Sequence, residues 1–180
     1  MEDGRPFILL GTAQARWRWT HGYVDDVGAA VALAATDRRA AGQIYNLGEP
    51  RTPTVAERVR ALARAVEWRG DVLTVPDADL PAGMRSDVDH RVDIALDTRK
   101  IRRELGYAEP VAYDEALRRT AEWLRAADVR PAEEPPDYAA EDAVAAANPD
   151  ASPPRASQGD GKASSPDRSG GTIREAEPGG

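Results

Sequence analysis

The sequence of 180 residues contains no cysteine. Disulfides, thiolate metal sites and cysteine nucleophiles are therefore excluded, and the redox compartment stays undetermined. Long apolar runs are lacking too. Pro6–Leu10 is too short for the core of a signal peptide, and no run approaches the roughly 20 residues that span a bilayer. We therefore expect a soluble protein without a membrane partner, and the cytoplasm is the default location.

A concentrated positive charge is also missing. The net charge is −7, and residues 131–180 contribute most of it with 10 acids and 4 bases. Residues 1–130 hold 21 acids and 20 bases, a net charge of −1. Nucleic acids bind to a concentrated positive field. We therefore expect no nucleic-acid partner.

Large aliphatic residues are scarce after residue 130. Pro131–Gly180 holds eight of the 14 prolines, and Val144 and Ile173 are its only large aliphatics. Such a segment cannot bury enough apolar surface to offset its ordering entropy. We expect one folded domain over residues 1–130. A disordered, acidic tail rich in Pro, Ala, Ser and Gly follows over residues 131–180, with at most a transient helical turn at Ala139–Ala147.

Apolar residues at three- and four-residue steps predict two helices in the first half of the chain. The first covers Val24–Thr36 and begins with Asp25 and Asp26, where carboxylates favour the helix dipole. The second begins at Thr54, which forms a capping box with Glu57. Its apolar stripe consists of Val55, Val59, Leu62 and Val66.

Two further helices are predicted in the second half. Asp97 caps a short turn that buries Ile101 and Leu105, and Gly106 ends it. The last helix covers Tyr113–Ala126. Its inward residues are expected to be Ala116, Leu117, Thr120, Trp123 and Leu124.

Three short segments read as strands: Gln43–Leu47, Val72–Val75 and the alternating Val92–Leu96. Asp77–Asp89 mixes Pro, Gly and Asp and reads as a loop. This mixture indicates an α/β or α+β protein, with too few strands for a complete doubly wound sheet.

The motifs of a nicotinamide enzyme are absent. No Gly-rich turn follows a strand, and neither lysine, Lys100 or Lys162, has a tyrosine four residues earlier. No serine lies in a nucleophile elbow. A metal site built from His21 and His90 with Asp25 or Asp93 would lack any short ligand spacing. We therefore predict no catalytic, cofactor-binding or metal-binding residue.

Two groups of residues are candidates for binding a substrate. The stretch Arg16–Tyr23 places aromatics and cations just ahead of the first helix, where loops often line pockets. In an alternative interpretation of this stretch, Trp17 and Trp19 alternate as strand core residues and the arginines face water. A second group, formed by Arg85, His90 and Arg91, is equally compatible with ordinary surface charge. The candidates are Arg18, Trp19, His21 and Tyr23 in the first group, and Arg85, His90 and Arg91 in the second.

Four motifs occur in a specific order: Tyr23–Val27 opening a helix, Gln43–Gly48, Thr54 opening the next helix, and Asp97–Tyr107. In this order and spacing the chain resembles the C-terminal part of the extended short-chain dehydrogenase/reductase family, which contains the NAD-dependent epimerases and dehydratases of nucleotide sugars. The resemblance covers about residues 6 to 127.

The resemblance implies the C-terminal part of a Rossmann-like doubly wound fold, with a small substrate-binding lobe formed after Asp71. The missing half of the family pattern would carry the nucleotide-binding turn and the catalytic tyrosine and lysine. NAD or NADP is the implied cofactor, and we do not expect it to bind this chain alone. The implied partners are a small-molecule substrate and either the missing half or a second copy of the chain.

Two positions depart from the family pattern. Trp19 stands where an arginine is usual, with Arg18 one residue earlier, and Asp87–His90 replaces an Arg-x-x-Asp motif. Arginine is the natural bidentate partner of a diphosphate. Its displacement weakens the case for a nucleotide sugar and favours a smaller carbonyl or hydroxy compound.

Two hypotheses follow for the function. In the first, the chain is the substrate side of an NAD(P)-dependent epimerase, dehydratase or reductase, in which Arg18, His21 and Arg91 orient the substrate. In the second, it is a non-catalytic ligand-binding or protein-interaction module derived from that fold. Under either hypothesis the chain alone should be inactive.

Overall fold

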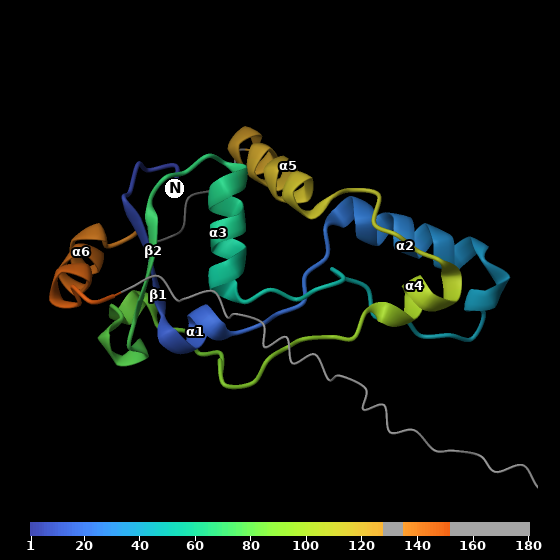
Figure 1. Ribbon diagram of the computed structural model, residues 1–180, viewed down its shortest axis with the longest axis horizontal. Helices are drawn as coiled ribbons and strands as arrows, with labels where there is room; N and C mark the ends of the chain where they lie inside the picture. The colour runs from blue at the N-terminus through green and yellow to red at the C-terminus, as the bar shows by residue number, and fades with distance from the viewer. Residues whose placement is uncertain (128–134, 152–180) are drawn as a thin grey trace, which may run out of the picture.

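A computed structural model describes residues 1–127 and 135–151 of the chain (Figure 1). The elements are β1 (Phe7–Gly11), α1 (Thr12–Arg16), α2 (Val24–Thr36), η1 (Arg38–Ala40), α3 (Val55–Ala65), β2 (Asp71–Val75), η2 (Asp77–Asp79), η3 (Ala82–Met84), α4 (Arg99–Leu105), α5 (Tyr113–Ala126) and α6 (Tyr138–Ala147). This mixture agrees with the α/β class. None of the described helices is both long and apolar enough to cross a membrane.

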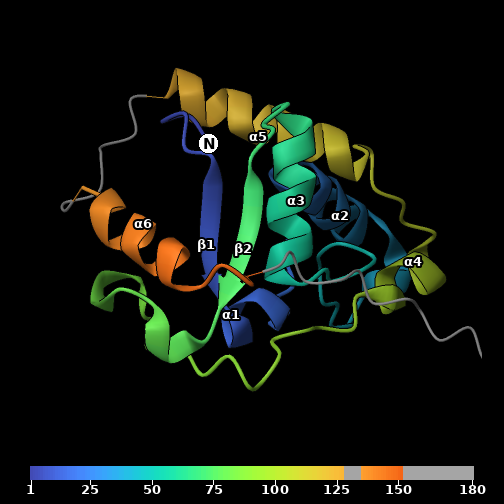
Figure 2. The same cartoon turned by 60° about the vertical axis from the view of Figure 1, so that its left-hand side comes forward.

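A parallel pair of strands forms the centre of one lobe (Figure 2). β1 pairs with β2 in a register that runs from Phe7 opposite Asp71 to Gly11 opposite Val75. Successive side chains of a strand point to opposite faces. One face packs on α3, through Leu10 and Val72. The opposite face presents Leu9 and Val75.

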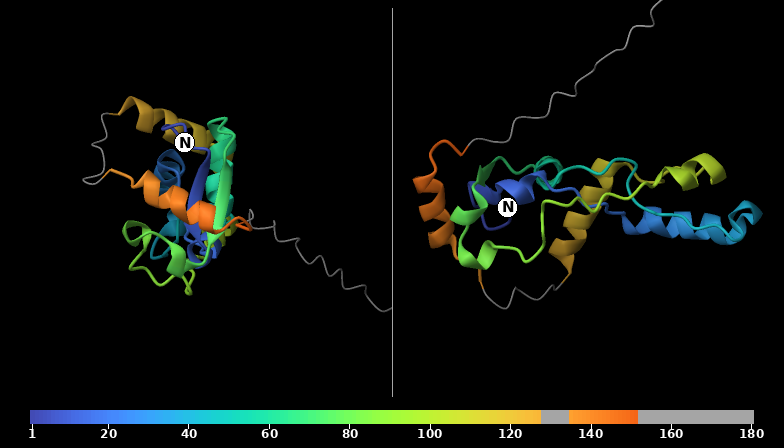
Figure 3. Two further views of the ribbon diagram at one scale, coloured as in Figure 1. Left: turned by 90° about the vertical axis from the view of Figure 1, so that its left-hand side faces the viewer. Right: turned by 90° about the horizontal axis from the view of Figure 1, so that it is seen from below.

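A second core lies at the other end of the molecule, where α2 and α4 form an arm that extends away from the sheet (Figure 3). Ala30 of α2 contacts Ile101 and Leu105 of α4, and all three are at most 5% exposed. Gly106 ends α4 with a φ of 72°, a left-handed conformation that glycine adopts at little cost. The predicted positions of Ile101, Leu105 and Gly106 are therefore confirmed.

The helix predictions succeed because their signals are local. α2 and α5 have the predicted bounds. The capping box is present at α3: the Glu57 amide donates to the Thr54 hydroxyl at 3.2 Å, and the Thr54 amide donates to the Glu57 carboxylate at 2.8 Å. The predicted inward face of α5 is only partly correct. Ala116 is buried, whereas Trp123 and Leu124 are 64% and 50% exposed.

Two predicted strands are wrong. Gln43–Leu47 has no strand structure and Ile44 is 84% exposed. Val92–Leu96 is reduced to a single bridge between Ile94 and Trp19. A strand is stabilised by backbone hydrogen bonds to a neighbouring strand. Among the described residues, neither of these two segments lies beside a strand with which it could form such a ladder. Val72–Val75 is confirmed as part of β2, and β1 was not anticipated.

The prediction of no persistent structure after about Val129 is also wrong for α6. This helix covers the face of the sheet opposite to α3, where Val144 packs against the cluster around Leu9, Val75 and Leu80 (Figure 2). A short Ala-rich helix is marginal alone and gains stability from tertiary packing. The remainder of the predicted tail, residues 131–134 and 152–180, lies outside the described residues.

An ion pair ties Arg5, just before β1, to α6. The Arg5 guanidinium is 17% exposed, pairs with Asp142 and lies 3.9 Å from Glu141. It also lies over the Tyr138 ring, 4.6 Å from the ring centroid. This pairing lowers the pKa of the Asp142 carboxyl. The acidic residues of the predicted tail thus have a specific structural use.

Glu115, in the first turn of α5, should make the stability of the protein depend on pH. Hydrogen bonds from Arg118 and Arg119 lower its pKa to about 2. The stabilising contribution is therefore complete above the unfolded-state pKa and is lost as the pH falls from about 4.5 toward about 2. We expect Glu115→Gln to lower the midpoint of thermal unfolding near neutral pH.

The difference in unfolding midpoint between the wild type and Glu115→Gln should shrink as the pH falls from about 4.5 toward about 2. The matched control is Asp114→Asn on the same turn, because Asp114 forms no ion pair with a described residue. Thermal scans by circular dichroism across the window test the expectation. A Glu115→Gln difference that is the same at every pH would contradict it.

Candidate functional site

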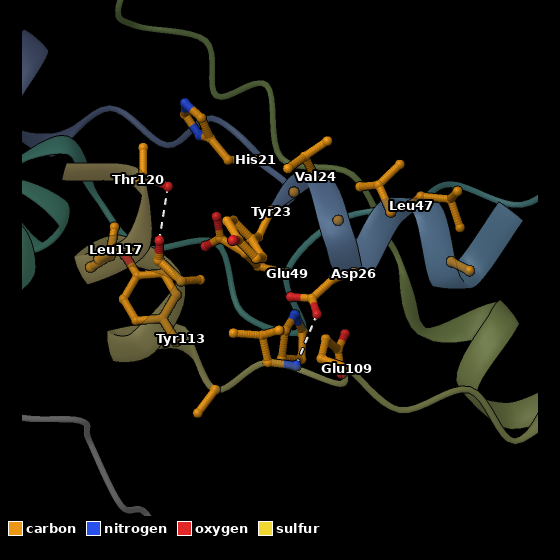
Figure 4. Close-up of a pocket in the computed structure, with 18 of the residues that line it drawn as sticks. His21, Tyr23, Val24, Asp26, Leu47, Glu49, Glu109, Tyr113, Leu117 and Thr120 are labelled. Carbon is orange, nitrogen blue, oxygen red and sulfur yellow. Dashed lines mark hydrogen bonds between the residues drawn. The ribbon is translucent and has the colours of Figure 1, made fainter. Parts of the chain in front are cut away.

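A cavity of about 840 Å³ lies between α2 and α5, and we call it the interhelical groove (Figure 4). Its walls are mainly apolar, and they also contain the loop at residues 47–50 and the segment that precedes α5. The apolar residues are Val24, Val27, Ala30, Leu47, Pro50, Ile101, Val111, Ala112, Ala116, Leu117 and Trp123.

The buried carboxylate of Asp26 fixes the two walls of the groove relative to each other. Its side chain is almost inaccessible to solvent and accepts a hydrogen bond of 3.0 Å from the Val111 amide (Figure 4). The Tyr107 hydroxyl donates to the Asp26 carbonyl at 2.8 Å. The sequence analysis assigned Asp26 to the helix dipole and missed this tertiary role, because the partners lie about 80 residues away.

A partly buried ion pair lies on one side of the groove. The Arg58 guanidinium donates to both carboxylate oxygens of Glu49, at 2.8 and 3.2 Å. The Glu49 backbone is fixed as well: its amide donates to the His21 carbonyl at 2.8 Å, and its carbonyl accepts from the Thr98 hydroxyl at 2.9 Å. Glu49 and Arg58 thus connect α3 and α4 to the loop before α2.

Tyr113 adds a polar atom to the same wall. Its hydroxyl is buried and has no hydrogen-bond partner among the described residues. Burial raises the pKa of Tyr113, and the nearby charge of Arg58 partly opposes that shift. The groove therefore combines a large apolar surface with a few polar groups, an arrangement typical of binding surfaces.

The predicted substrate-binding residues divide between two cavities. His21 and Tyr23 line the interhelical groove. Arg85, His90 and Arg91 line a smaller cavity of about 440 Å³, which we call the loop pocket. The loop pocket is completed by Ala13, Gln14, Asp77, Ala78, Leu80, Met84, Ser86, Val88 and Asp89. Arg18 and Trp19 line neither cavity.

Ring contacts nevertheless connect the two predicted groups. The ring centroids are 4.7 Å apart for Trp19 and His21, 5.7 Å for Trp17 and Trp19, and 5.0 Å for Trp17 and His90. We call these four residues the aromatic ladder. Trp17, which was not among the predicted site residues, joins the two groups. Trp17, Trp19 and His21 are spaced two residues apart along the chain, and this spacing was the signal that could have identified Trp17.

The predicted arginines mostly serve the structure. Arg18 is half-buried and donates to the Thr52 carbonyl at 2.6 Å, which does not agree with the alternative interpretation in which the arginines face water. Arg85 donates to the carbonyls of Leu80 and Ala78 at 3.0 and 2.8 Å. Arg91 is exposed and pairs with the Asp89 carboxylate, an interaction that lowers the pKa of Asp89 to about 2.

The described residues do not fit the pyrophosphate of NAD or NADP. Such a site needs a Gly-rich turn and free amides at the start of a helix. β1 leads into α1 through Gly11, but the Asp77 carboxylate already accepts a hydrogen bond of 3.1 Å from the Ala13 amide. A second carboxylate oxygen of Asp77 would lie 2.4 Å from a Cβ at Gly11. The charge at this turn would repel a phosphate.

Metal chemistry has no candidate site in the part of the chain that the structure describes. No group of three or more His, Asp or Glu side chains there could hold a metal ion. The His21 Nδ1–H donates to the Trp19 carbonyl, 2.8 Å away. The histidines belong to the aromatic ladder.

Comparison with known proteins gives a limited but consistent result. The chain is 32% identical over 124 residues to a dTDP-glucose 4,6-dehydratase of Streptomyces niveus, covering 68% of this chain and 33% of that protein. It is 29% identical over 145 residues to the uncharacterized protein y4nL of Sinorhizobium fredii, covering 68% of this chain and 40% of that protein.

No model of a known protein family matches the chain, and no solved structure matches it significantly. The chain spans a third to two fifths of the length of the two curated relatives. The sequence similarity therefore supports a relationship to the dehydratase-like superfamily, and no finer assignment.

Proposed function

We propose that this chain forms the substrate side of a dehydratase-like protein and acts with a separate portion that holds the nicotinamide cofactor. The observation that carries the proposal is the interhelical groove, an apolar cavity of about 840 Å³ that α2 and α5 line and leave open. Contiguous apolar surface rimmed by polar residues is one feature of protein interfaces. The matched stretch covers only 33% and 40% of the two relatives, so the remainder of such a protein supplies a reason for an interface.

Exposed side chains on the same helices support this docking surface. Val24 and Val31 of α2 are 72% and 54% exposed, and Trp123 of α5 is 64% exposed. The lobe around β1 and β2 buries its apolar residues on both faces of the sheet. We therefore place the proposed docking surface on the arm and α5.

For the substrate, the hydrogen bonds of the arginines favour a small carbonyl or hydroxy compound over a compound that carries a diphosphate. Arg18 and Arg85 are bonded to backbone carbonyls, and Arg91 pairs with Asp89. A diphosphate would have to displace these partners to obtain a bidentate guanidinium clamp. His90 and Arg91 in the loop pocket are the groups that we propose orient the substrate.

The experiment is co-expression. The reading frame immediately upstream of the gene is expressed together with the tagged chain, and the purified material is tested for saturable NAD(H) or NADP(H) binding by calorimetry. We expect a stable complex that binds the cofactor, whereas the tagged chain alone does not. A complex without cofactor binding, or an upstream frame that encodes no nucleotide-binding turn, would contradict the proposal.

A charge placed in the groove should prevent docking. Leu117 lines the groove, whereas Leu124 lies on the same helix, is 50% exposed and does not line it. We expect Leu117→Asp to weaken the complex at least about tenfold, because docking would bury an unpaired carboxylate. Leu124→Asp is the matched control and should bind as the wild type does.

Affinity measured by biolayer interferometry gives the comparison, and circular dichroism shows whether each variant keeps its helices. Equal affinities for the two variants would place the interface elsewhere.

A further inference from the structure

α6 is attached to the sheet by one face that contains little aliphatic surface. The less exposed positions of the helix recur at the spacing of a single helical face, and they are Tyr138, Ala140, Glu141, Val144 and Ala145. Val144 is the only large aliphatic side chain in α6, and none of the ten residues of the helix is buried. A helix of this length is marginal without tertiary packing. Charged groups therefore contribute much of the attachment.

The charged part of the attachment centres on Arg5, just before β1. Its guanidinium lies 5.0 Å from the ring centroid of Phe7 and 4.6 Å from that of Tyr138. It pairs with Asp142, and the 15% exposed side chain of Glu141 lies 3.9 Å away. The Arg5 Nε atom is buried without a hydrogen-bond partner among the described residues. Arg5 is thus largely removed from water, and α6 supplies the carboxylates that compensate its charge.

α6 also shares an apolar wall with the loop pocket. The helix lies beside the segment that contains η2 and η3 (Figures 1 and 2). We call residues 77–91 the pocket loop. Val144 of α6 and Met84 of the pocket loop pack against the same cluster, which includes Leu80. Leu80 and Met84 in turn line the loop pocket. A movement of α6 therefore changes the support of the pocket wall.

The centre of the pocket loop depends on this packing for its position. Arg85 donates to the carbonyls of Leu80 and Ala78 at 3.0 and 2.8 Å, so these hydrogen bonds stay within the loop. The Asp77 carboxylate fixes only the beginning of the loop, where it accepts from the Ala13 amide at 3.1 Å. Hydrogen bonds within a loop do not fix its place relative to the sheet. The packing of Leu80, which is 5% exposed, does so.

We propose that α6 is a detachable strap, which alternates between a docked helix and an undocked, unfolded segment and which holds the pocket loop against the sheet when docked. Undocking removes Val144 from the shared wall and lets the pocket loop move outward. Because coupling between two sites is reciprocal, a ligand in the loop pocket should also stabilise docked α6. The effect on a substrate rests on the proposed function of the loop pocket, whereas the coupling itself is a property of this chain alone.

The ionic part of the attachment makes the strap sensitive to salt. The Asp142 side chain is 55% exposed, so dissolved ions reach its pair with Arg5. Raising NaCl from about 0.1 M to about 1 M shortens the Debye length from about 10 Å to about 3 Å. Apolar packing is not screened in this way. Salt should therefore undock α6 and leave α3, which packs on the other face of the sheet, in place.

The test follows α6 and the pocket wall separately in the full chain. Hydrogen–deuterium exchange of peptides from α6 reports undocking, and peptides from α3 report the integrity of the sheet. Oxidation of the half-buried Met84 by dilute hydrogen peroxide reports exposure of the wall. Between about 0.1 M and about 1 M NaCl we expect α6 exchange and Met84 oxidation to accelerate together, each at least about threefold, with α3 unchanged.

Arg5→Gln removes the cation of the strap. In about 0.1 M NaCl it should accelerate α6 exchange at least about tenfold and Met84 oxidation severalfold, and it should abolish most of the response to salt. The matched control is Arg125→Gln, which breaks the exposed pair with Glu2 near the same terminus and should behave as the wild type does.

Three results would overturn the proposal. They are unchanged α6 exchange in Arg5→Gln, faster α6 exchange without faster Met84 oxidation, and an equal acceleration of α3, which would mean that the sheet and its helices open as one unit. The salt series on the wild type decides the matter if Arg5→Gln does not fold. None of these results bears on the interhelical groove, so the strap can fail while the proposed docking stands.

Discussion

Replacing Ile101 by alanine is expected to lower the free energy of unfolding by about 3 to 4 kcal/mol. Ile101 is 1% exposed and lies in the only contact cluster that joins α4 to Ala30 of α2 among the described residues. Truncation removes buried apolar surface and leaves a cavity that two short helices cannot easily close. Because Ile101 also lines the interhelical groove, the variant should weaken docking as well.

Urea unfolding followed by circular dichroism gives the free energy. The control is Ile44→Ala, at a position that is 84% exposed, where a change of at most about 0.5 kcal/mol is expected. Similar losses for the two variants would mean that α2 and α4 do not form a cooperative core.

Arg58→Ala has the next largest expected effect, a loss of about 2 to 3 kcal/mol. The side chain of its partner Glu49 is only 12% exposed, so the substitution leaves a poorly solvated carboxylate without its cation. The value lies at the low end for buried pairs because Arg58 itself is 20% exposed. The loop that Glu49 anchors should loosen at the same time.

A double-mutant cycle isolates the pair. If the unpaired charge causes the loss, then adding Glu49→Gln to Arg58→Ala should restore part of the stability. Urea unfolding of the wild type, both single variants and the double variant supplies the four free energies. Simple additivity of the two single changes would show that the pair contributes nothing of its own.

The helices were predictable from sequence because their determinants lie within a few residues of one another. Thr54 and Glu57 specify a start, and Gly106 specifies an end. The strands were less predictable: Val72–Val75 was identified, but β1 was missed. A strand depends on a neighbour that can be far along the chain, and β1 and β2 are separated by about 60 residues. Gln43–Leu47 has the composition of a strand but meets no partner among the described residues.

The tail was misjudged for a related reason. Composition correctly shows that the segment around α6 cannot form a core of its own. It does not show that a single residue, Val144, can pack on a face that β1 and β2 have already formed. The ion pair between Arg5 and Asp142, 137 residues apart, is equally invisible in the sequence.

The contacts among the candidate residues could not be predicted from the sequence. The sequence singled out Trp19, His21 and His90, and the structure joins them through Trp17. Arg18 was expected to be free for a substrate, but a carbonyl 34 residues away engages it. Whether a polar side chain is free depends on all of its neighbours, which local patterns do not reveal.

Titration of the isolated chain with NAD, NADH, NADP and NADPH tests most directly the claim that it is a substrate side whose cofactor is held elsewhere. Because Asp77 occupies the amide at the start of α1, we predict no saturable binding of any of the four at concentrations up to about 100 µM. Saturable binding at low micromolar concentration, reduced by Arg18→Ala or His21→Ala, would show that the chain contains a cofactor site of its own and would contradict the account.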